Sequence, residues 1–293
     1  MNYNTFSIVA RCPRTCMLGV AVSTAVPAVG STCPHIIPGV GAASTQAWVN
    51  PYLAINSLKR LQSGADASTA LAEGLRADDA RDLRQIGLVD AAGHAASWSG
   101  AACTPWFGHL TGEGWAIQGN MLTGPEVLDA MRDAFLGAED AALAERLVLA
   151  LEAGQSAGGD KRGKQSAALL VYGVEDYAAV DLRVDEHAYP VAELRRVWTV
   201  FQAQTMPFLQ GMPRKGQPPQ PAPDDVVAML LRPPAERPGA APAPDLWADV
   251  LGIDVPPQRR AELLAAFSTI GEEIRRLRGL DLTDIHPAVV FRP

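Results

Sequence analysis

The sequence has no long apolar run, no basic leader and only four cysteines, and each shortage excludes a class of protein. No stretch reaches the roughly 18–20 apolar residues of a membrane span, and the opening MNYNTFSIVARCP lacks the basic segment and apolar core of a secretory signal. We therefore expect a cytoplasmic protein that does not enter a membrane. Four cysteines in a 293-residue chain indicate reduced thiols, because a chain of this size needs no disulfide framework.

Motifs that organise common catalytic centres are also missing. Neither HExxH, which places two histidines on one helix face for zinc, nor GxSxG, which presents a nucleophilic serine, occurs. Cys12 and Cys16 are spaced C-x3-C with no second pair, so we predict no metal site and no cofactor. The formal net charge of −7 argues against a nucleic-acid-binding surface.

What the sequence does have is ample apolar content, followed by a proline-rich stretch. Hydrophobic residues make up 48% of the chain, enough for a sizeable core. Eleven prolines lie between residues 207 and 244, where they prevent a long helix or a central strand. We therefore predict three parts: a domain at 1–206, a linker with one short helix at 207–244, and a helical module at 245–293.

Hydrophobic spacing within the first part predicts an α+β domain. Strands are expected at 5–10, 18–23, 40–49, 86–90, 94–99, 115–122, 167–172 and 181–184. Helices are expected around Leu53 to Leu61, at 67–75, after the capping-box pattern of residues 123–126, around Leu143 to Leu151, and at 190–204.

A cationic loop between a predicted helix and a buried strand is one candidate site. Asp160 is followed by Lys161, Arg162 and Lys164, beside glycines that let a ligand approach the backbone. In an acidic protein this cluster could hold a carboxylate or a similar anion. A solvated turn is the alternative, because charge runs usually face water.

Thr5 is the second candidate, because it opens the first predicted strand beside a strand that ends in Ser23 and Thr24. If Thr5 became an amino terminus, its own α-amine, with a reference pKa near 8, would serve as the base for its hydroxyl in acyl transfer. Asn120, at the end of another strand, is a candidate donor to a developing oxyanion. A structural hydroxyl and a turn-forming asparagine are the alternatives.

Six stretches share their order with a known family. They are TFSIVAR (5–11), LGVAVST (18–24), GVGAASTQAWVNP (39–51), RQIGLVD (84–90), TGEGWAIQGNML (111–122) and LEAGQSAGGDKRGKQSAALLV (151–171). Over residues 5–200 the chain resembles the family catalogued as domain of unknown function 1028. This resemblance implies a four-layer αββα sandwich of the N-terminal-nucleophile-hydrolase type, joined here to a small all-α module.

The same resemblance implies site residues. Thr5 occupies the position of the first-strand nucleophile, and the loop around Asp160 lies near the expected site. Family members commonly begin Met-Thr, whereas Met1–Asn4 precede Thr5 here. Removal of the methionine alone would therefore not expose the amine, and a further cleavage is needed.

The C-terminal tail carries a resemblance of its own. The segments LWADVLGID (246–254) and LDLTDIHPAVVFRP (280–293) resemble the small accessory subunits of amidase-signature enzymes, such as those of carboxybiuret hydrolase and of oxalurate breakdown. The resemblance implies that residues 245–293 bind a separate amidase. A helical hairpin folded back on its own domain is the alternative.

Together these features predict an amidohydrolase for a small anionic amide or ureido compound, coupled through its tail to an amidase. Thr5 and Asn120 are the expected catalytic residues. Substrate-binding roles are expected for Ser23, Asp160, Lys161 and Arg162. A non-catalytic binding or stabilising subunit of the amidase is the alternative, a sensor of a small anion is a third possibility, and we expect a homo-oligomer.

Overall fold

The computed structural model describes residues 5–218, 220–239 and 259. The chain divides into two compact units, residues 1–239 and 240–293. Apart from Arg259, the predicted helical module at 245–293 lies outside the described residues, and so do Met1–Asn4. Within the described ranges, no helix is both long and apolar enough to cross a membrane.

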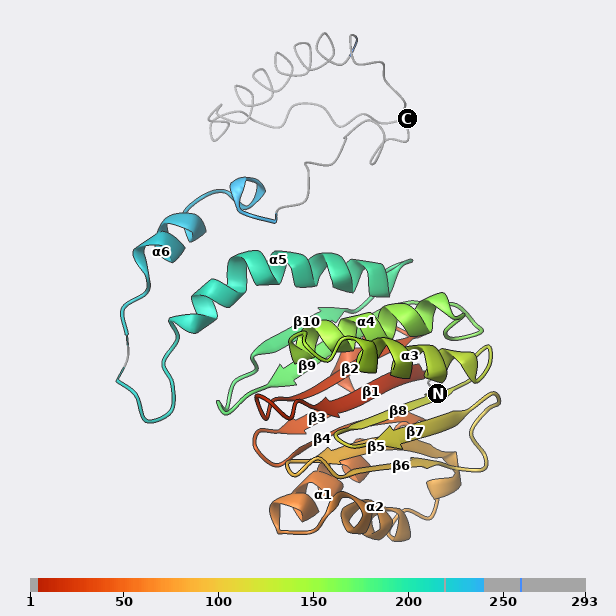
Figure 1. Cartoon of the computed structure of the whole chain (residues 1–293). Coiled ribbons are helices and arrows are strands. Elements are labelled where there is room, and N and C mark those ends of the chain that lie inside the picture. Colours follow the sequence, from red (N-terminus) through yellow and green to blue (C-terminus); the bar gives the residue numbers. More distant parts are fainter. Residues whose placement is uncertain (1–4, 219, 240–258, 260–293) are drawn as a thin grey trace, which may run out of the picture. The chain divides into compact units, whose positions relative to one another are not determined.

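Two antiparallel sheets form the centre of the first unit (Figure 1). The six-stranded sheet has the order β10-β9-β2-β1-β8-β7, built from β1 (Thr5–Arg11), β2 (Leu18–Thr24), β7 (Gly108–Gly112), β8 (Trp115–Asn120), β9 (Ser166–Tyr172) and β10 (Val180–Val184). The four-stranded sheet has the order β3-β4-β5-β6, built from β3 (Pro34–Ile37), β4 (Gly41–Ala47), β5 (Arg84–Asp90) and β6 (Ala95–Ser99).

Helices cover the outer face of each sheet. The four-stranded sheet is covered by α1 (Pro51–Gln62) and α2 (Ala67–Arg76), and the six-stranded sheet by α3 (Glu126–Gly137), α4 (Leu143–Ser156) and α5 (Pro190–Gln210) (Figure 1). A further helix, α6 (Asp224–Leu230), and the short 3-10 turns Val29–Ser31, Arg81–Leu83 and Pro234–Glu236 complete the described elements. The predicted α+β class with two antiparallel sheets is confirmed.

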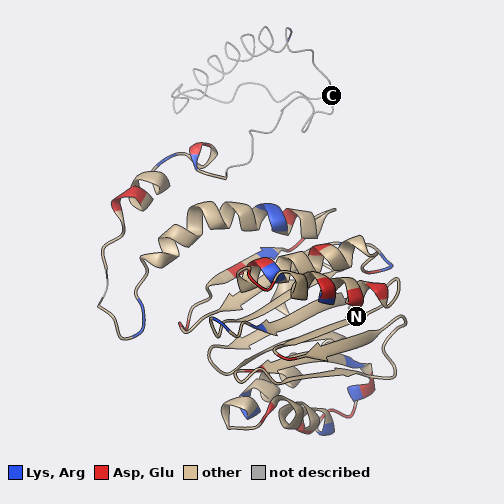
Figure 2. Ribbon diagram, viewed as in Figure 1, with Lys and Arg blue, Asp and Glu red and all other residues tan. Residues whose placement is uncertain are grey.

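Strand β1 shows why the layers hold together. Phe6 and Ile8 point to one face, where they pack in an apolar core with residues of α3 and α4. Val9 points to the other face and packs against Ala42 and Val89 of the four-stranded sheet. Because side chains alternate along a strand, Thr5 and Ser7 share the Val9 face and lie between the sheets. Lysine, arginine, aspartate and glutamate lie mainly on the helices and loops, leaving the sandwich interior largely uncharged (Figure 2).

Two local predictions were wrong, and two strands were missed. Helix α5 continues to Gln210 through Pro207, six residues beyond its predicted end, since one missing backbone donor in its last turn does not break it. The capping box does not form, because Pro125 is the N-cap residue of α3 and the Thr123 hydroxyl donates to the Ala157 carbonyl at 3.4 Å instead. Strands β3 and β7 were not predicted at all.

The described part of the proline-rich segment belongs to the first unit and is hydrogen-bonded to its other elements. The Lys215 ammonium lies 2.7 Å from an Asp176 carboxylate oxygen, and the Tyr177 hydroxyl donates to the Pro213 carbonyl at 3.0 Å. Further along, the Gln204 side-chain amide donates to the Pro238 carbonyl at 2.9 Å. These contacts tie the segment to the loop after β9 and to α5.

Candidate active site

Three strand ends bring Thr5, Thr24 and Asn120 together. In the strand register, Thr5 of β1 lies opposite Thr24 of β2 on one side and Asn120 of β8 on the other. Directly opposed residues of antiparallel strands project to the same face, so all three side chains face the four-stranded sheet. The Thr5 hydroxyl donates to the Thr24 hydroxyl at 3.3 Å, and all three residues are buried.

Ser23 is not part of this group. It lies opposite Phe6, whose side chain packs in the core beneath the helices, so Ser23 projects to the other face of the sheet. Its hydroxyl donates to the Ser166 carbonyl at 3.2 Å. The hydroxyl of β2 that contacts Thr5 therefore belongs to Thr24, because the register of the β1–β2 hairpin pairs residue 5 with residue 24.

A buried amide network ties this corner to the second sheet. The Gln46 side-chain nitrogen donates to the Thr5 carbonyl at 3.2 Å and to the Gln85 side-chain oxygen at 2.8 Å. The Asn120 side-chain nitrogen donates to the same Gln85 oxygen at 2.9 Å. The Gln85 nitrogen in turn donates to the Gly119 carbonyl at 2.8 Å. Sequence reasoning missed both glutamines, although each is a large polar residue within a strand that is otherwise buried.

Ser7 extends the network one residue pair deeper. Its hydroxyl donates to the Gln46 side-chain oxygen at 2.6 Å and accepts from the Gln118 side-chain nitrogen at 2.6 Å. The Gln118 oxygen and the Ser44 hydroxyl are buried without a hydrogen-bond partner among the described residues. The polar layer between the sheets is thus connected over several strands and is not fully satisfied.

The Asn120 side chain has a second N–H group beyond the one that contacts Gln85. A side-chain amide carries two N–H groups, and within the described part of the chain the Asn120 nitrogen makes one hydrogen bond, to Gln85. Beyond Asn120 the backbone turns sharply at Met121, which has a φ of 51°. This turn ends β8 next to the start of β1.

The predicted anion loop lies against the same strand ends. The Asp160 carboxylate, with 1% of its side chain exposed, accepts from the Ala25 backbone N–H at 3.2 Å and lies 3.0 Å from an Arg162 guanidinium nitrogen. Asp160 also forms a β-bridge with Leu122, just beyond the end of β8. Asp160 therefore anchors the loop beside the residues that follow Thr24 and Asn120.

The three cations of the loop point to different partners. Arg162 pairs with Asp160, whereas the Lys161 ammonium donates to the Pro105 carbonyl at 2.8 Å. The Lys164 ammonium lies 4.4 Å from the centre of the Tyr189 ring. Lys161 is exposed, and an ammonium has three hydrogens, so this residue has donors for an incoming anion while it holds the loop at 101–107.

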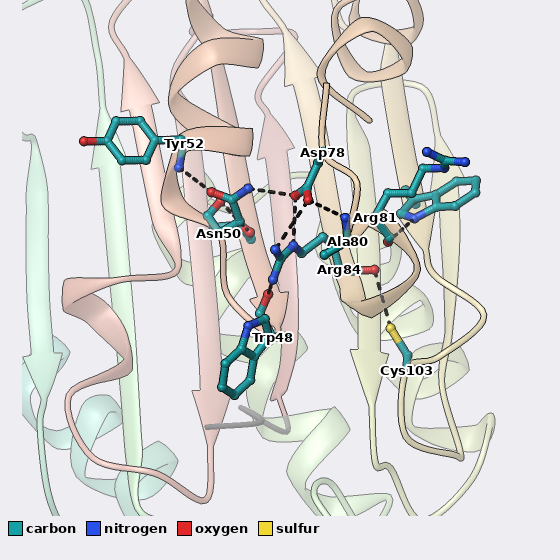
Figure 3. Close-up of polar contacts among 10 residues, drawn as sticks. Trp48, Asn50, Tyr52, Asp78, Ala80, Arg81, Arg84 and Cys103 are labelled. Carbon is teal, nitrogen blue, oxygen red and sulfur yellow. Dashed lines mark hydrogen bonds and ion pairs between the residues drawn. The ribbon is translucent and has the colours of Figure 1, made fainter. Parts of the chain in front are cut away.

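A largely buried ion pair braces the neighbouring end of the four-stranded sheet (Figure 3). The Arg84 guanidinium donates to an Asp78 carboxylate oxygen at 2.9 Å and to the Trp48 carbonyl at 2.7 Å. The Asn50 amide donates to the same Asp78 oxygen at 2.7 Å. Burial raises the pKa of the Asp78 carboxyl, but hydrogen bonds from Arg84 and Asn50 lower it more, and the net shift is downward. Arg84 thereby holds the backbone at Trp48, an exposed aromatic residue two positions after Gln46.

The fold and the site together define a class of protein. It is an α+β sandwich with a buried threonine at the start of its central strand. Residues 5–194 match the model of a family described as "Family of unknown function (DUF1028)". The chain belongs to this family.

One solved structure agrees with that membership, and others are less similar to the chain. Protein SPO2555 from Silicibacter pomeroyi, whose description also gives DUF1028, is 30% identical, with a TM-score of 0.64 over 69% of this chain and 91% of that one. Anbu (ancestral beta-subunit) from Yersinia bercovieri is 13% identical, with a TM-score of 0.34 over 72% of this chain and 100% of that one. Anbu from Hyphomicrobium sp. strain MC1 is 11% identical, with a TM-score of 0.33 over 72% and 100%. No curated protein matches the chain.

Proposed function

We propose that this protein is an amidohydrolase of the N-terminal-nucleophile type that acts on a small anionic amide or ureido compound. The observation that carries the proposal is the position of the Thr5 hydroxyl, at the start of β1 between Thr24 and Asn120. A threonine at this position becomes a nucleophile when the peptide bond before it is hydrolysed, because the released α-amine then lies beside the hydroxyl.

The proposed reaction proceeds through an ester on the Thr5 oxygen. Hydrolysis of the Asn4–Thr5 bond leaves a carboxylate on Asn4 and an amine on Thr5. The amine accepts the hydroxyl proton as the Thr5 oxygen bonds to the substrate carbonyl carbon, and the second N–H of Asn120 donates to the oxyanion. The C–N bond then breaks, and the leaving nitrogen takes the proton from the amine. Water hydrolyses the resulting ester, releasing the acid and restoring the Thr5 hydroxyl.

The loop at 158–164 binds the anionic end of the substrate in this proposal. In this proposal Lys161 receives the carboxylate, and Asp160 holds Arg162 beside it. Thr24 takes the substrate-binding role that the sequence predicts for Ser23, because its hydroxyl contacts that of Thr5.

The test is hydrolysis by the purified full chain of a small panel of anionic amides and ureides, such as oxamate and N-carbamoylglycine, followed as ammonia release. We expect turnover by the wild type and a loss of at least about a thousandfold in Thr5→Val, while Thr5→Ser keeps part of the rate. Thr111→Val on β7 is the matched control and should keep full activity. Full activity in Thr5→Val would overturn the mechanism.

A second candidate function is a non-catalytic binding or stabilising subunit. The observation that favours it is that the Thr5 hydroxyl is fully buried and hydrogen-bonded to Thr24, as expected of a structural core group. This candidate predicts no turnover of any panel member by the wild type, together with an uncut bond before Thr5.

For the tail we propose that residues 245–293 bind an amidase-signature enzyme of the same nitrogen-compound pathway. The support is the resemblance of the tail sequence and the division of the chain near residue 240. Co-expression with such an amidase, followed by size exclusion with and without residues 245–293, tests it. Co-elution should require the tail, and the same column reports whether the chain alone is a homo-oligomer.

A further inference from the structure

A cavity lies at the other end of the sandwich from Thr5. It has a volume of about 500 Å³, within the range of small-molecule sites. Its lining includes Arg11, at the far end of β1. Arg11 lies six positions along the extended strand from Thr5, which corresponds to about 20 Å. The cavity is therefore distinct from the candidate active site.

Three turns and two helices build the walls of this cavity. Arg11 leads into the β1–β2 turn, Gly93 belongs to the β5–β6 turn, and Gly114 belongs to the β7–β8 turn, while Phe135 of α3 and Arg146 of α4 close the other side. Backbone hydrogen bonds tie the turns together: the Arg11 N–H donates to the Gly114 carbonyl and the Gly114 N–H to the Gly93 carbonyl, each at 2.8 Å. The cavity is thus preformed.

Arg146 is the unusual residue of the lining. It is only 5% exposed, yet its guanidinium forms no ion pair with any residue in the described ranges. Its Nε donates to the Phe135 carbonyl at 3.2 Å, and its guanidinium carbon lies 3.9 Å from the centre of the Phe135 ring. Burial lowers the pKa of Arg146. A buried arginine is normally paired, because the loss of hydration is otherwise not offset.

Arg11 contributes a second guanidinium. Its Nε is buried and has no hydrogen-bond partner among the described residues. One terminal nitrogen donates to the Cys16 sulfur at 3.3 Å, a weak acceptor. Like Arg146, Arg11 forms no ion pair within the described part of the chain.

The acidic residues of the lining lie at its rim. Glu113, Glu139 and Asp140 are exposed, and Asp140 is already 3.7 Å from Arg14. The interior is therefore cationic and the entrance carries both signs. Such an entrance disfavours polyanions, whereas a planar carboxylate matches the fork of a guanidinium.

We propose that this cavity binds a small organic carboxylate, held by Arg146 and Arg11. The carboxylate supplies the anionic partner that both guanidinium groups lack among the described residues, and the Phe135 ring keeps the Arg146 plane in position. Glu113 and Glu139 at the rim suit a ligand whose other end carries hydrogen-bond donors.

Isothermal titration of the full chain with acetate, succinate, glycine and inorganic phosphate, at constant ionic strength, tests the proposal. We expect saturable binding of at least one of the carboxylates, weakened at least tenfold in Arg146→Met and in Arg11→Met. Arg146→Lys should fall between, because it keeps the charge but loses the fork. Arg132→Met, which removes a solvent-facing arginine of α3, is the matched control and should bind as the wild type does.

Three results would overturn the proposal: no saturable binding of any carboxylate, wild-type affinity in both methionine variants, or tighter binding of phosphate than of every carboxylate. Circular dichroism of each variant separates lost binding from lost folding. If Arg146→Met does not fold, Arg11→Met and Arg146→Lys carry the test. The outcome is independent of Thr5, so Thr5→Val should bind the carboxylate normally.

Discussion

Gln85 and Asn120 lie in different sheets, and the Asn120 amide nitrogen donates to the Gln85 side-chain oxygen over 2.9 Å. Both residues are buried, and the same oxygen also accepts from Gln46. The orientation of Asn120 at the end of β8 is therefore set from the four-stranded sheet. In the proposed reaction this contact aims the remaining N–H of Asn120 toward the substrate.

Removal of the Gln85 amide should lower the stability of the fold. In Gln85→Leu the donors of Gln46 and Asn120 and the carbonyl of Gly119 all lose a partner, and unsatisfied buried groups cost about 1–3 kcal/mol each. We expect urea denaturation to show a loss of about 3 kcal/mol in the free energy of unfolding. Gln62→Leu, at an exposed position of α1, should change it by less than about 0.5 kcal/mol. A loss below about 1 kcal/mol for Gln85→Leu would show that the network is not structural.

The sequence was sufficient to predict most strands and the proximity of Thr5, Asn120 and the Asp160 loop. Hydrophobic alternation identified β1 and β8, and the family resemblance put their ends together. The choice between Ser23 and Thr24 was not predictable, because a one-residue change in hairpin register exchanges the faces of a strand. Gln46 and Gln85 stand out as large polar residues in buried strands, but nothing in the local sequence shows that their sheet packs face to face against the strands that carry Thr5 and Asn120.

The Arg84–Asp78 ion pair should contribute more to the free energy of unfolding than an ion pair on the surface does. Both side chains are 11% exposed, so Arg84→Met leaves a buried carboxylate and frees the Trp48 carbonyl. We expect a loss of about 2–3 kcal/mol in the free energy of unfolding. The control is Arg60→Met, which breaks the more exposed Arg60–Glu73 pair and should cost less than about 1 kcal/mol. Equal losses in the two variants would contradict the assigned role of burial.

His35 should make the fold sensitive to mild acid. Burial lowers the pKa of His35 in the folded state, although its hydrogen bond to the Cys33 carbonyl opposes the shift. The unfolded chain, with an ordinary pKa near 6.5, then binds the proton more readily, so stability falls as the pH drops below about 6.5. Urea denaturation between pH 8 and 5.5 should show a smaller decline for His35→Gln than for the wild type. Parallel declines would refute the assignment.

Asp160 should organise the loop at 158–164. In Asp160→Asn one acceptor oxygen becomes a donor, which conflicts with the Ala25 N–H or with Arg162. We expect faster hydrogen exchange of the backbone amides in the loop and slower hydrolysis of anionic substrates. Asp185→Asn, which alters the exposed pair with Arg183, is the control and should leave loop exchange unchanged. Unchanged exchange in Asp160→Asn would mean that the loop is held by other contacts.

In the proposed mechanism Thr5 becomes the amino-terminal nucleophile. The most direct measurement is the intact mass of the freshly purified full chain, with the N-terminal peptide sequenced, for the wild type and for Thr5→Val. We expect a wild-type species that begins at Thr5 and gains the mass of the acyl group when trapped with substrate. We expect no acylated species for Thr5→Val. A wild type that hydrolyses the substrate while the bond before Thr5 stays intact would contradict the mechanism.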